Sequence, residues 1–468
     1  MVYRRTQLGQ GCAYPVSLFR KIWSVIKEDA LLGKVIRNSA HLFTSNTLSL
    51  ALTVVQGALA VRLLGATGLG LITLVMGYAS TVNSLLSFRM SELVVRYGGE
   101  YIEKGERTRA SALIKAASLT EASVSVLAFL VVLATAGWAS QTIAKTPGAA
   151  VLFVVFALGL LGNFNVETSI GILQVTGKIR FQGTVNLIQS IVSIIIVIVA
   201  FFWGNALLLV LLAYLVGKLI LGLGLFILAQ RQLRDVLGVG WSRTPLSTIQ
   251  NLRGVVRFAV SSNISATIIK IFRESEPLWV GYFLSTGAVG YYKVAYSLVG
   301  FLSVPADPLI AATYPEINRL IVQKAWSALQ GFLRKVTSIS FVINAAAALG
   351  FIFLGRLALT IYAGSEEFAL AYPAMLALFV GLAFNYTLFW NRPLLLSLGL
   401  PEFPIWATLM AGIIKVGLAF WLIPKFGILA AGVLLSYYYI ASVGVMALRG
   451  AREIKAQAEA KRFEGQLA

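Results

Sequence analysis

Residues 257–307 have the sequence RFAVSSNISATIIKIFRESEPLWVGYFLSTGAVGYYKVAYSLVGFLSVPAD. The stretch is apolar enough to enter a bilayer, but four charged side chains fall within seven residues of it: Lys270, Arg273, Glu274 and Glu276. An ionisable residue at membrane depth costs about 2.5–3.5 kcal/mol on insertion scales, so these side chains need partners, water or a ligand. One face of the predicted helix carries Asn263, Thr267, Lys270, Glu274 and Pro277, with Arg273 beside it and Glu276 pointing away. The polar stripe predicts the wall of a water-filled cavity.

The composition of the whole chain defines its class. Hydrophobic residues make up 58% and charged residues 12% of the sequence, and the mean hydropathy is +0.81. These values are typical of a polytopic helical membrane protein. The net charge of +20 would suit a nucleic-acid partner in a soluble protein, but in a membrane protein it indicates basic cytoplasmic loops, so we expect no nucleic acid. The single cysteine, Cys12, and the single histidine, His41, exclude internal disulfides and multi-histidine metal sites.

Hydrophobic runs long enough to cross about 30 Å of hydrocarbon recur along the chain. We predict twelve transmembrane helices, at 42–64, 69–95, 112–136, 149–176, 183–203, 206–229, 257–284, 287–312, 336–362, 369–397, 402–424 and 427–448. The boundaries are weakest where Gly or Pro joins two runs, at 65–68, 204 and 424–427. The predicted fold class is therefore all-α integral membrane protein.

The basic residues predict the orientation of these helices. Most of the 39 Lys and Arg residues lie before the first run, after the even-numbered runs or in the C-terminal tail. Only Arg62, Lys145, Arg356 and Lys425 lie in the connections on the other side. By the positive-inside rule both termini are cytoplasmic, and the protein is a multi-pass protein of the cell (inner or plasma) membrane.

Short motifs repeat at similar offsets along the chain. ATGLGL at 66–71 matches STGAVGY at 285–291, and VTGKIRF at 175–181 matches SLGLPEF at 397–403, with offsets of 219 and 222 residues. An even number of helices per repeat predicts two six-helix bundles related by a pseudo-two-fold axis along the membrane normal, with the substrate between them. We assign these bundles to 41–229 and 257–448, a basic cytoplasmic linker to 230–256 and a cytoplasmic tail to 449–468.

Residues 1–40 have no small-residue cleavage site after a short apolar core, so no cleavable signal is expected. Leu18, Ile22, Ile26 and Trp23 alternate there with basic residues. Two interpretations stay open: an amphipathic helix on the cytoplasmic membrane surface, or a solvated tail.

Polar stripes on other helices extend the predicted cavity. Ser45, Ser49, Thr53 and Gln56 align on the first run, Glu167 and Gln174 on the fourth, and Lys293, Ser297 and Asp307 on the eighth. Such residues also hold membrane helices together by hydrogen bonds, and for Glu167 the sequence leaves both roles open. For Lys218 and Lys415 the open alternative is a packed lysine paired with a nearby carboxylate. The seven bases within the runs are Arg89, Lys218, Lys270, Arg273, Lys293, Arg392 and Lys415. They slightly outnumber the acids at similar depth, which favours an anionic substrate.

Enzyme signatures are missing from the sequence. It has no GxxxxGK[ST] phosphate-binding loop, no HExxH and no loop long enough for a catalytic domain. We therefore expect a transporter without cofactors, driven by a substrate gradient, by the membrane potential, or by a coupling ion such as Na⁺ or H⁺.

Several segments resemble the polysaccharide biosynthesis (O-antigen and capsule repeat-unit) flippases. The resemblance lies in RLLGATGLGLITLVMGYASTVNSLL with SELVVRYGGEYIEKGE, in ILQVTGKIRFQG, and in an acid followed by GYFL and GYY at 281–292. It covers most of 38–449 and extends to the superfamily of the multidrug and toxic compound extrusion transporters and peptidoglycan lipid flippases. It implies two bundles forming a V around a central cavity and alternating access. It also implies cavity bases that hold a lipid diphosphate, here Lys270, Arg273, Lys293, Arg62 and Arg89. The family often has Asp where Glu274 and Glu276 compete, so the acid is either an ion site or a partner of Lys270.

Three functions follow from these patterns. The first is a flippase that moves a lipid-diphosphate-linked oligosaccharide from the cytoplasmic to the outer leaflet, with glycosyltransferases or a polymerase of the same pathway as partners. The second is an exporter of drugs or metabolites coupled to Na⁺ or H⁺ through Glu167 or Glu274. The third, a glycan polymerase or ligase, lacks the large external loop we expect of such enzymes. The predicted substrate-binding bases are Lys270, Arg273, Lys293, Arg62, Arg89, Arg392 and Lys415. The candidate acids are Glu274, Glu276, Glu167 and Asp307, and the candidate polar lining is Asn46, Gln56, Asn263 and Thr267.

Overall fold

The structure, a computed structural model, describes residues 30–203, 206–249 and 252–467. Over these residues the chain forms helices joined by short connections, without strands, which confirms the all-α prediction. The N-terminal segment 1–29 lies outside the described residues. So do the side chains of 30–43, 252, 258, 260–266, 269, 305, 307–308, 311–312 and 460–467, and with them the predicted site residues Asn263 and Asp307.

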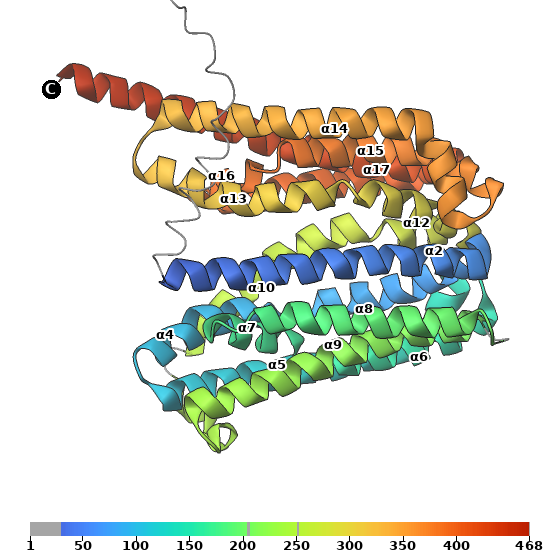
Figure 1. The fold of residues 1–468 in the computed structure, drawn as a ribbon, viewed down its shortest axis with the longest axis horizontal. Coiled ribbons are helices and arrows are strands. Elements are labelled where there is room, and N and C mark those ends of the chain that lie inside the picture. The colour runs from blue at the N-terminus through green and yellow to red at the C-terminus, as the bar shows by residue number, and fades with distance from the viewer. Residues whose placement is uncertain (1–29, 204–205, 250–251, 468) are drawn as a thin grey trace, which may run out of the picture.

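The N-terminal bundle comprises helices α2 to α9 (Figure 1). Their bounds are α2 Ala30–Leu86, α3 Met90–Leu93, a π-helical turn η1 Val94–Gly98, α4 Gly99–Glu103, α5 Arg107–Thr142, η2 Pro147–Ala149, α6 Ala150–Gly162, α7 Val166–Val175, α8 Arg180–Ala200 and α9 Ala206–Leu237. Two short turns, η3 Trp241–Arg243 and η4 Leu246–Thr248, lie between the bundles in sequence.

The C-terminal bundle comprises helices α10 to α17. Their bounds are α10 Leu252–Glu274, α11 Glu276–Phe283, α12 Thr286–Gly300, α13 Ser303–Val322, α14 Trp326–Ala363, η5 Glu366–Ala371, α15 Tyr372–Thr387, α16 Asn391–Ser397 and α17 Glu402–Leu467. In Figure 1 α13 to α17 lie above α2, and α5 to α9 lie below it.

Two of the long helices contain a glycine at which the chain reverses. Gly65 in α2 has φ 66° and Gly427 in α17 has φ 63°, a left-handed conformation that glycine adopts without steric cost. Figure 1 shows the consequence: the start of α2 and the later α4 lie on the same side, as do α16 and the C-terminal end of α17. Each of these two helices therefore contains two of the predicted hydrophobic runs. The chain reverses between them within the predicted connections at 65–68 and 424–427.

Eight segments of the described chain are long and apolar enough to cross a membrane: 44–103, 107–142, 147–175, 180–200, 206–237, 326–363, 366–397 and 402–459. The first and the last contain the reversals at Gly65 and Gly427. Between the fifth and sixth segments lie α10 to α13, where the charged residues of the opening stretch fall. The total of twelve crossings stays a prediction.

The two bundles meet most extensively where α2 packs against α12. A side chain on Gly70 would overlap the backbone carbonyl of Thr286, and one on Gly290 would overlap that of Ala66. These four residues belong to the repeated motifs ATGLGL and STGAVGY, so the two copies of the repeated motif face each other across the bundles. Small residues allow this backbone approach, as at other membrane helix interfaces.

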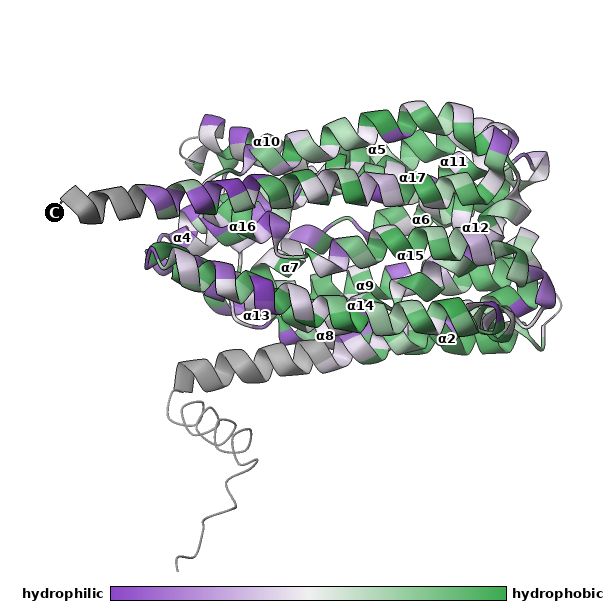
Figure 2. Ribbon diagram, turned by 90° about the horizontal axis from the view of Figure 1, so that it is seen from above, coloured by the Kyte–Doolittle hydropathy of each residue, from purple (hydrophilic) through white to green (hydrophobic). Residues whose placement is uncertain are grey.

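The outer surface of the bundles is apolar along most of its length. Exposed large side chains include Val342, Phe353, Trp406 and Phe420. Figure 2 shows hydrophilic residues gathered at the end that holds α4, α16 and the last turns of α17, and in the connections at the opposite end. An apolar belt between two polar ends is what a bilayer requires of a protein that crosses it.

Candidate functional site

A cavity of about 620 Å³ lies between the two bundles. The N-terminal bundle lines it with α2, with Phe156 of α6, and with Tyr214 and Lys218 of α9. The C-terminal bundle supplies the end of α10, the start of α11, one face of α12, and Tyr362 of α14. The cavity is thus shared by the two halves, as the repeat predicts.

The helix predicted over 257–284 is broken inside the apolar core. Helix α10 ends at Glu274 and α11 starts at Glu276, with Ser275 between them at φ −85° and ψ −7°. Pro277 explains the break, because it has no backbone N–H and its ring collides with the carbonyl four residues earlier. The last carbonyls of α10 therefore need other donors.

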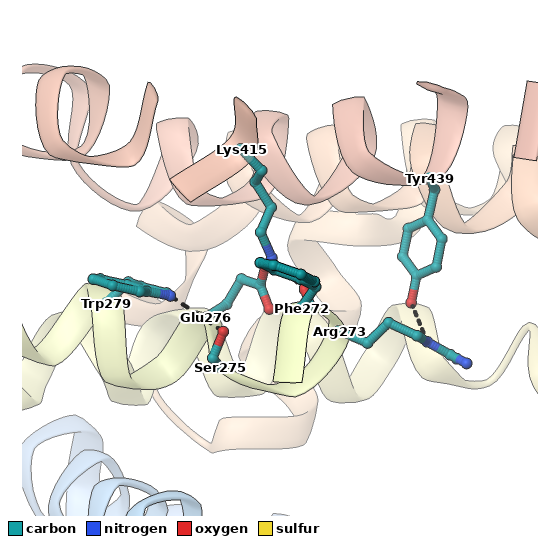
Figure 3. A network of polar contacts seen from close by, with 7 residues as sticks. All are labelled: Phe272, Arg273, Ser275, Glu276, Trp279, Lys415 and Tyr439. Carbon is teal, nitrogen blue, oxygen red and sulfur yellow. Dashed lines mark hydrogen bonds and ion pairs between the residues drawn. The ribbon is translucent and has the colours of Figure 1, made fainter. Parts of the chain in front are cut away.

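Lys415 of α17 supplies such a donor (Figure 3). Its ammonium group donates to the carbonyl of Phe272 and to Oε1 of Glu276, with both charged side chains at most 5% exposed. The ring centroid of Tyr438 lies 5.1 Å from Nζ, which adds a cation–π contact. Of the two paired residues, Glu276 lines the cavity, whereas Lys415 lies behind it and is not a lining residue.

Arg273 extends in the other direction from the break. Its Nε donates to the hydroxyl of Tyr439 at 3.2 Å, and its guanidinium carbon lies 5.7 Å from the centroid of that ring (Figure 3). The Tyr439 hydroxyl thus fixes the guanidinium at its Nε. A guanidinium oriented in this way presents its forked donors to an anion.

Four bases and two acids line the cavity: Lys218, Lys270, Arg273 and Lys293, and Glu274 and Glu276. Because Lys415 neutralises Glu276 from behind the wall, the balance among the described lining residues is positive. Lys218 also lies 5.3 Å from the ring centroid of Phe156. Such a cavity attracts an anion and disfavours a cation.

Uncharged polar side chains also line the cavity. Thr53, Thr73, Ser80, Thr81 and Ser84 come from α2, and Ser297 comes from α12. Thr73, Ser80 and Ser84 recur at the helical spacing that places residues on one face. Tyr214, Tyr292, Tyr296 and Tyr362 add aromatic surface. Hydroxyl groups and aromatic rings are the surfaces that sugars contact, by hydrogen bonds and by stacking of C–H faces.

The structure brings part of the predicted set into one place. Lys270, Arg273, Lys293, Glu274 and Glu276 all line the cavity. Glu276 differs from our helix-face prediction. A continuous helix would point its side chain away from the cavity, but the helix is broken at Ser275 and Glu276 lines the cavity. No ion pair joins the described side chains of Lys270 and Glu274; the acid paired in the interior is Glu276, with a lysine from another helix.

The remaining predicted bases lie elsewhere. Arg62 donates to the backbone carbonyls of Ile361 and Tyr362, and so ties α2 to α14. Arg89 forms a half-exposed ion pair of 3.5 Å with Glu92, and Arg392, on α16, is exposed and within electrostatic range of Arg89.

The predicted polar residues are similarly divided. Thr267 donates to the carbonyl of Ser84 at 3.1 Å, between the bundles, whereas Gln56 is buried outside the lining. Asn46 accepts a hydrogen bond of 3.1 Å from Asn186, and Glu167 lies within the N-terminal bundle, where Ser91 donates to it at 2.5 Å. The sequence analysis did not predict Lys218, or the hydroxyl groups of α2 after Thr53, as lining residues. The helical spacing of Thr73, Ser80 and Ser84 could have predicted that these three share one face.

Together these features define a helical membrane protein with a polar, positively charged cavity between two bundles. A family model described as "Polysaccharide biosynthesis protein" matches residues 35–321, more than half of the sequence. The chain belongs to this polysaccharide biosynthesis protein family.

Several known proteins are similar to this chain. The inner membrane protein YghQ of Escherichia coli (strain K12) is 21% identical over 293 residues, which span 62% of this chain and 82% of that protein. Among solved structures, the lipid II flippase MurJ in an inward closed conformation has a TM-score of 0.68 at 14% identity, covering 90% of each chain. An inward-facing multidrug resistance MATE family transporter of the MOP superfamily has a TM-score of 0.66 at 15% identity, covering 89% of this chain and 96% of that one. These similarities confirm the two-bundle fold.

Proposed function

We propose that the protein is a flippase that moves a lipid-diphosphate-linked oligosaccharide from the cytoplasmic to the outer leaflet by alternating access. The proposal depends mainly on one observation, the surplus of Lys and Arg in the cavity between the bundles. A diphosphate is held by point charges and forked N–H donors, which Lys270, Lys293 and Arg273 provide. The family assignment supports a role in polysaccharide synthesis.

The two walls of the cavity suit the two parts of such a headgroup. The bases of α10 and α12 face the diphosphate, and the hydroxyl groups of α2 with the tyrosine rings face the sugar. The lipid tail stays in the bilayer, because the apolar outer surface of the bundles gives it a continuous path. No chemical bond changes in this process, so we assign no catalytic residue and no cofactor, and the protein acts as a transporter.

The test is transport by the full-length protein in liposomes. A fluorescent lipid-diphosphate sugar should move between leaflets, and Arg273→Ala combined with Lys270→Ala should abolish movement without loss of folded protein. Lys425→Ala is the matched control, because Lys425 packs over Trp421, with Nζ 4.4 Å from the ring centroid, and lies outside the cavity lining.

Two results would contradict the proposal. Full activity in the Arg273 and Lys270 double variant would remove the cationic cavity from the mechanism. Absence of lipid movement together with ion-driven efflux of cationic dyes would favour the exporter of drugs or metabolites that the sequence left as the second function.

A further inference from the structure

The four basic residues of the predicted outer connections divide into two kinds. Arg356 and Lys425 pack over aromatic rings of their own C-terminal bundle, with Cζ 5.6 Å and Nζ 4.4 Å from the ring centroids. Arg62 and Lys145 belong to the N-terminal bundle and donate hydrogen bonds to backbone carbonyls of the C-terminal bundle. Two of the four bases therefore join the bundles directly.

Arg62 caps the end of α14. Its Nε donates to the carbonyl of Tyr362 at 3.3 Å, and a terminal nitrogen of the guanidinium donates to the carbonyl of Ile361. Both carbonyls lie in the last turn of α14, which ends at Ala363, where carbonyls lack donors from their own helix. The arginine stem passes close to Gly364, since a Cβ on this glycine would lie 3.0 Å from Cγ of Arg62. A positive charge is favourable at a helix C-terminus.

Lys145 caps a second helix of the C-terminal bundle, α11. Its Nζ donates at 2.9 Å to the carbonyl of Leu284, the residue that follows α11. The backbone of Lys145 has φ 51°, in the left-handed region that residues other than glycine rarely adopt. Such a conformation persists where the surrounding structure fixes it, and it is common in switch regions. Glycine would fit this backbone without strain, so the presence of lysine indicates a role for its side chain.

Both capped helices belong to the wall of the cavity. Tyr362 of α14 lines it, as do the first residues of α11. Helix α11 is also in close contact with the N-terminal bundle: a Cβ on Gly281 would lie 2.6 Å from a methyl group of Leu74 and 3.0 Å from the carbonyl of Ile143. The two bases therefore hold cavity-lining helices at places where the bundles touch.

The two contacts are of a kind that can open. The side chains of Arg62 and Lys145 are exposed, so water competes for their N–H groups. An exposed cation at a helix C-terminus shifts an equilibrium by a factor of about two to five. Contacts of this size favour a closed state without making it permanent.

We propose that Arg62 and Lys145 form a two-point latch that holds the cavity closed on its predicted outer side, and that both contacts break when the cavity opens to that side. The latch rests on the proposed function, because alternating access requires this opening. The N-terminal bundle supplies the charges and the C-terminal bundle supplies the helix ends, so separation of the bundles breaks both contacts. The latch gives Arg62 a role other than the substrate binding that the family resemblance implies.

Labelling of a single cysteine in the full-length protein tests the latch. Cys12→Ser removes the only native cysteine, and Thr73→Cys places one in the cavity lining. A membrane-impermeant maleimide added outside intact cells should label this cysteine slowly while the latch is present. Arg62→Ala and Lys145→Gly should each speed the labelling about two- to fivefold, and together by about the product of the two factors.

Arg356→Ala and Lys425→Ala are the matched controls. Each removes a base of the same predicted side that contacts a ring of its own bundle, so the labelling rate should stay unchanged. Thermal unfolding separates opening of the latch from loss of structure. Lys145→Gly should keep the midpoint of its parent, because glycine adopts φ 51° without steric cost.

Two outcomes would overturn the latch. They are rapid labelling while both bases are present, and equal labelling rates in the latch variants and the controls. If the wild type moves lipid in liposomes but the latch variants label no faster, the latch is wrong and the flippase function stands. Faster labelling of the latch variants without lipid movement by the wild type would contradict the flippase function and leave the latch standing.

Discussion

Each half of the molecule contains a helix broken within its apolar interior. In each half a charged side chain forms hydrogen bonds with the backbone groups exposed at the break, and the two side chains have opposite charges. At the break between α6 and α7, Glu121 accepts hydrogen bonds from the N–H groups that start α7. At the break between α10 and α11, Lys415 donates to the Phe272 carbonyl near the end of α10. A helix start exposes donors and a helix end exposes acceptors, so the exposed end decides the sign of the buried charge.

The two breaks also differ in how the charge of the buried side chain is balanced. Lys415 meets an opposite charge, Glu276, and the pair is neutral as it stands. Glu121 instead accepts hydrogen bonds from the backbone N–H groups of Glu167 and Thr168. The comparison teaches that the C-terminal break is held by a buried ion pair, whereas the N-terminal break is held by hydrogen bonds from a helix start to one carboxylate.

The largest effect on stability is expected from Lys415→Ala. It leaves the Glu276 carboxylate buried without a counter-charge and the Phe272 carbonyl without this donor, which costs about 3–5 kcal/mol. The yield of folded protein and equilibrium unfolding in mixed micelles measure the loss. A variant as stable as the wild type would show that Lys415 does not support the break.

A smaller loss is expected from Glu121→Ala. The backbone N–H groups of Glu167 and Thr168 at the start of α7 lose their acceptor, and removing such a helix cap costs about 0.5–2 kcal/mol. The same unfolding experiment measures it, with Glu121→Gln as a variant that keeps one acceptor oxygen. A loss as large as that of Lys415→Ala would contradict the distinction between the two breaks.

Replacing both members of the C-terminal pair should restore much of the stability that Lys415→Ala removes. The double variant Lys415→Met with Glu276→Gln leaves no buried charge, so we expect a residual loss of roughly 1–2 kcal/mol, mainly from the Phe272 carbonyl. A double-mutant cycle of unfolding free energies gives the coupling. Additive losses would mean that the two charges do not stabilise each other.

The smallest effect is expected from Ser118→Ala beside the N-terminal break. Its hydroxyl donates to Oδ1 of Asn165, the residue before α7, at 3.3 Å. This is a long bond between neutral groups, so its removal should cost about 0.5–1.5 kcal/mol and leave the pH dependence of unfolding unchanged. Equilibrium unfolding in mixed micelles measures this loss, and a loss as large as that of Lys415→Ala would contradict the prediction.

Much of the cavity could be predicted from helical spacing and charge. Lys270 and Glu274 were placed on the cavity face because residues four apart share a face, and both line the cavity. The prediction for Glu276 was wrong because it assumed one continuous helix, although Pro277 was visible in the sequence as a helix breaker. Glu121 was not recognised as the partner of Glu167, since the two lie 46 residues apart and no local pattern relates them.

The sequence by itself determined the class of the protein, its two-bundle fold and the positive character of the interior. These properties follow from composition, from the period of the helix and from the repeat of short motifs, all of which are local or summed quantities. Only the tertiary structure decided which charges are free and which are neutralised. Lys415 and Lys218 are both isolated lysines in apolar runs of the sequence. In the structure Lys415 lies behind the cavity wall and pairs with the lining residue Glu276, whereas Lys218 itself lines the cavity. The reason is physical: a buried charge is stabilised by the groups within a few ångströms of it, and packing between distant helices sets those neighbours.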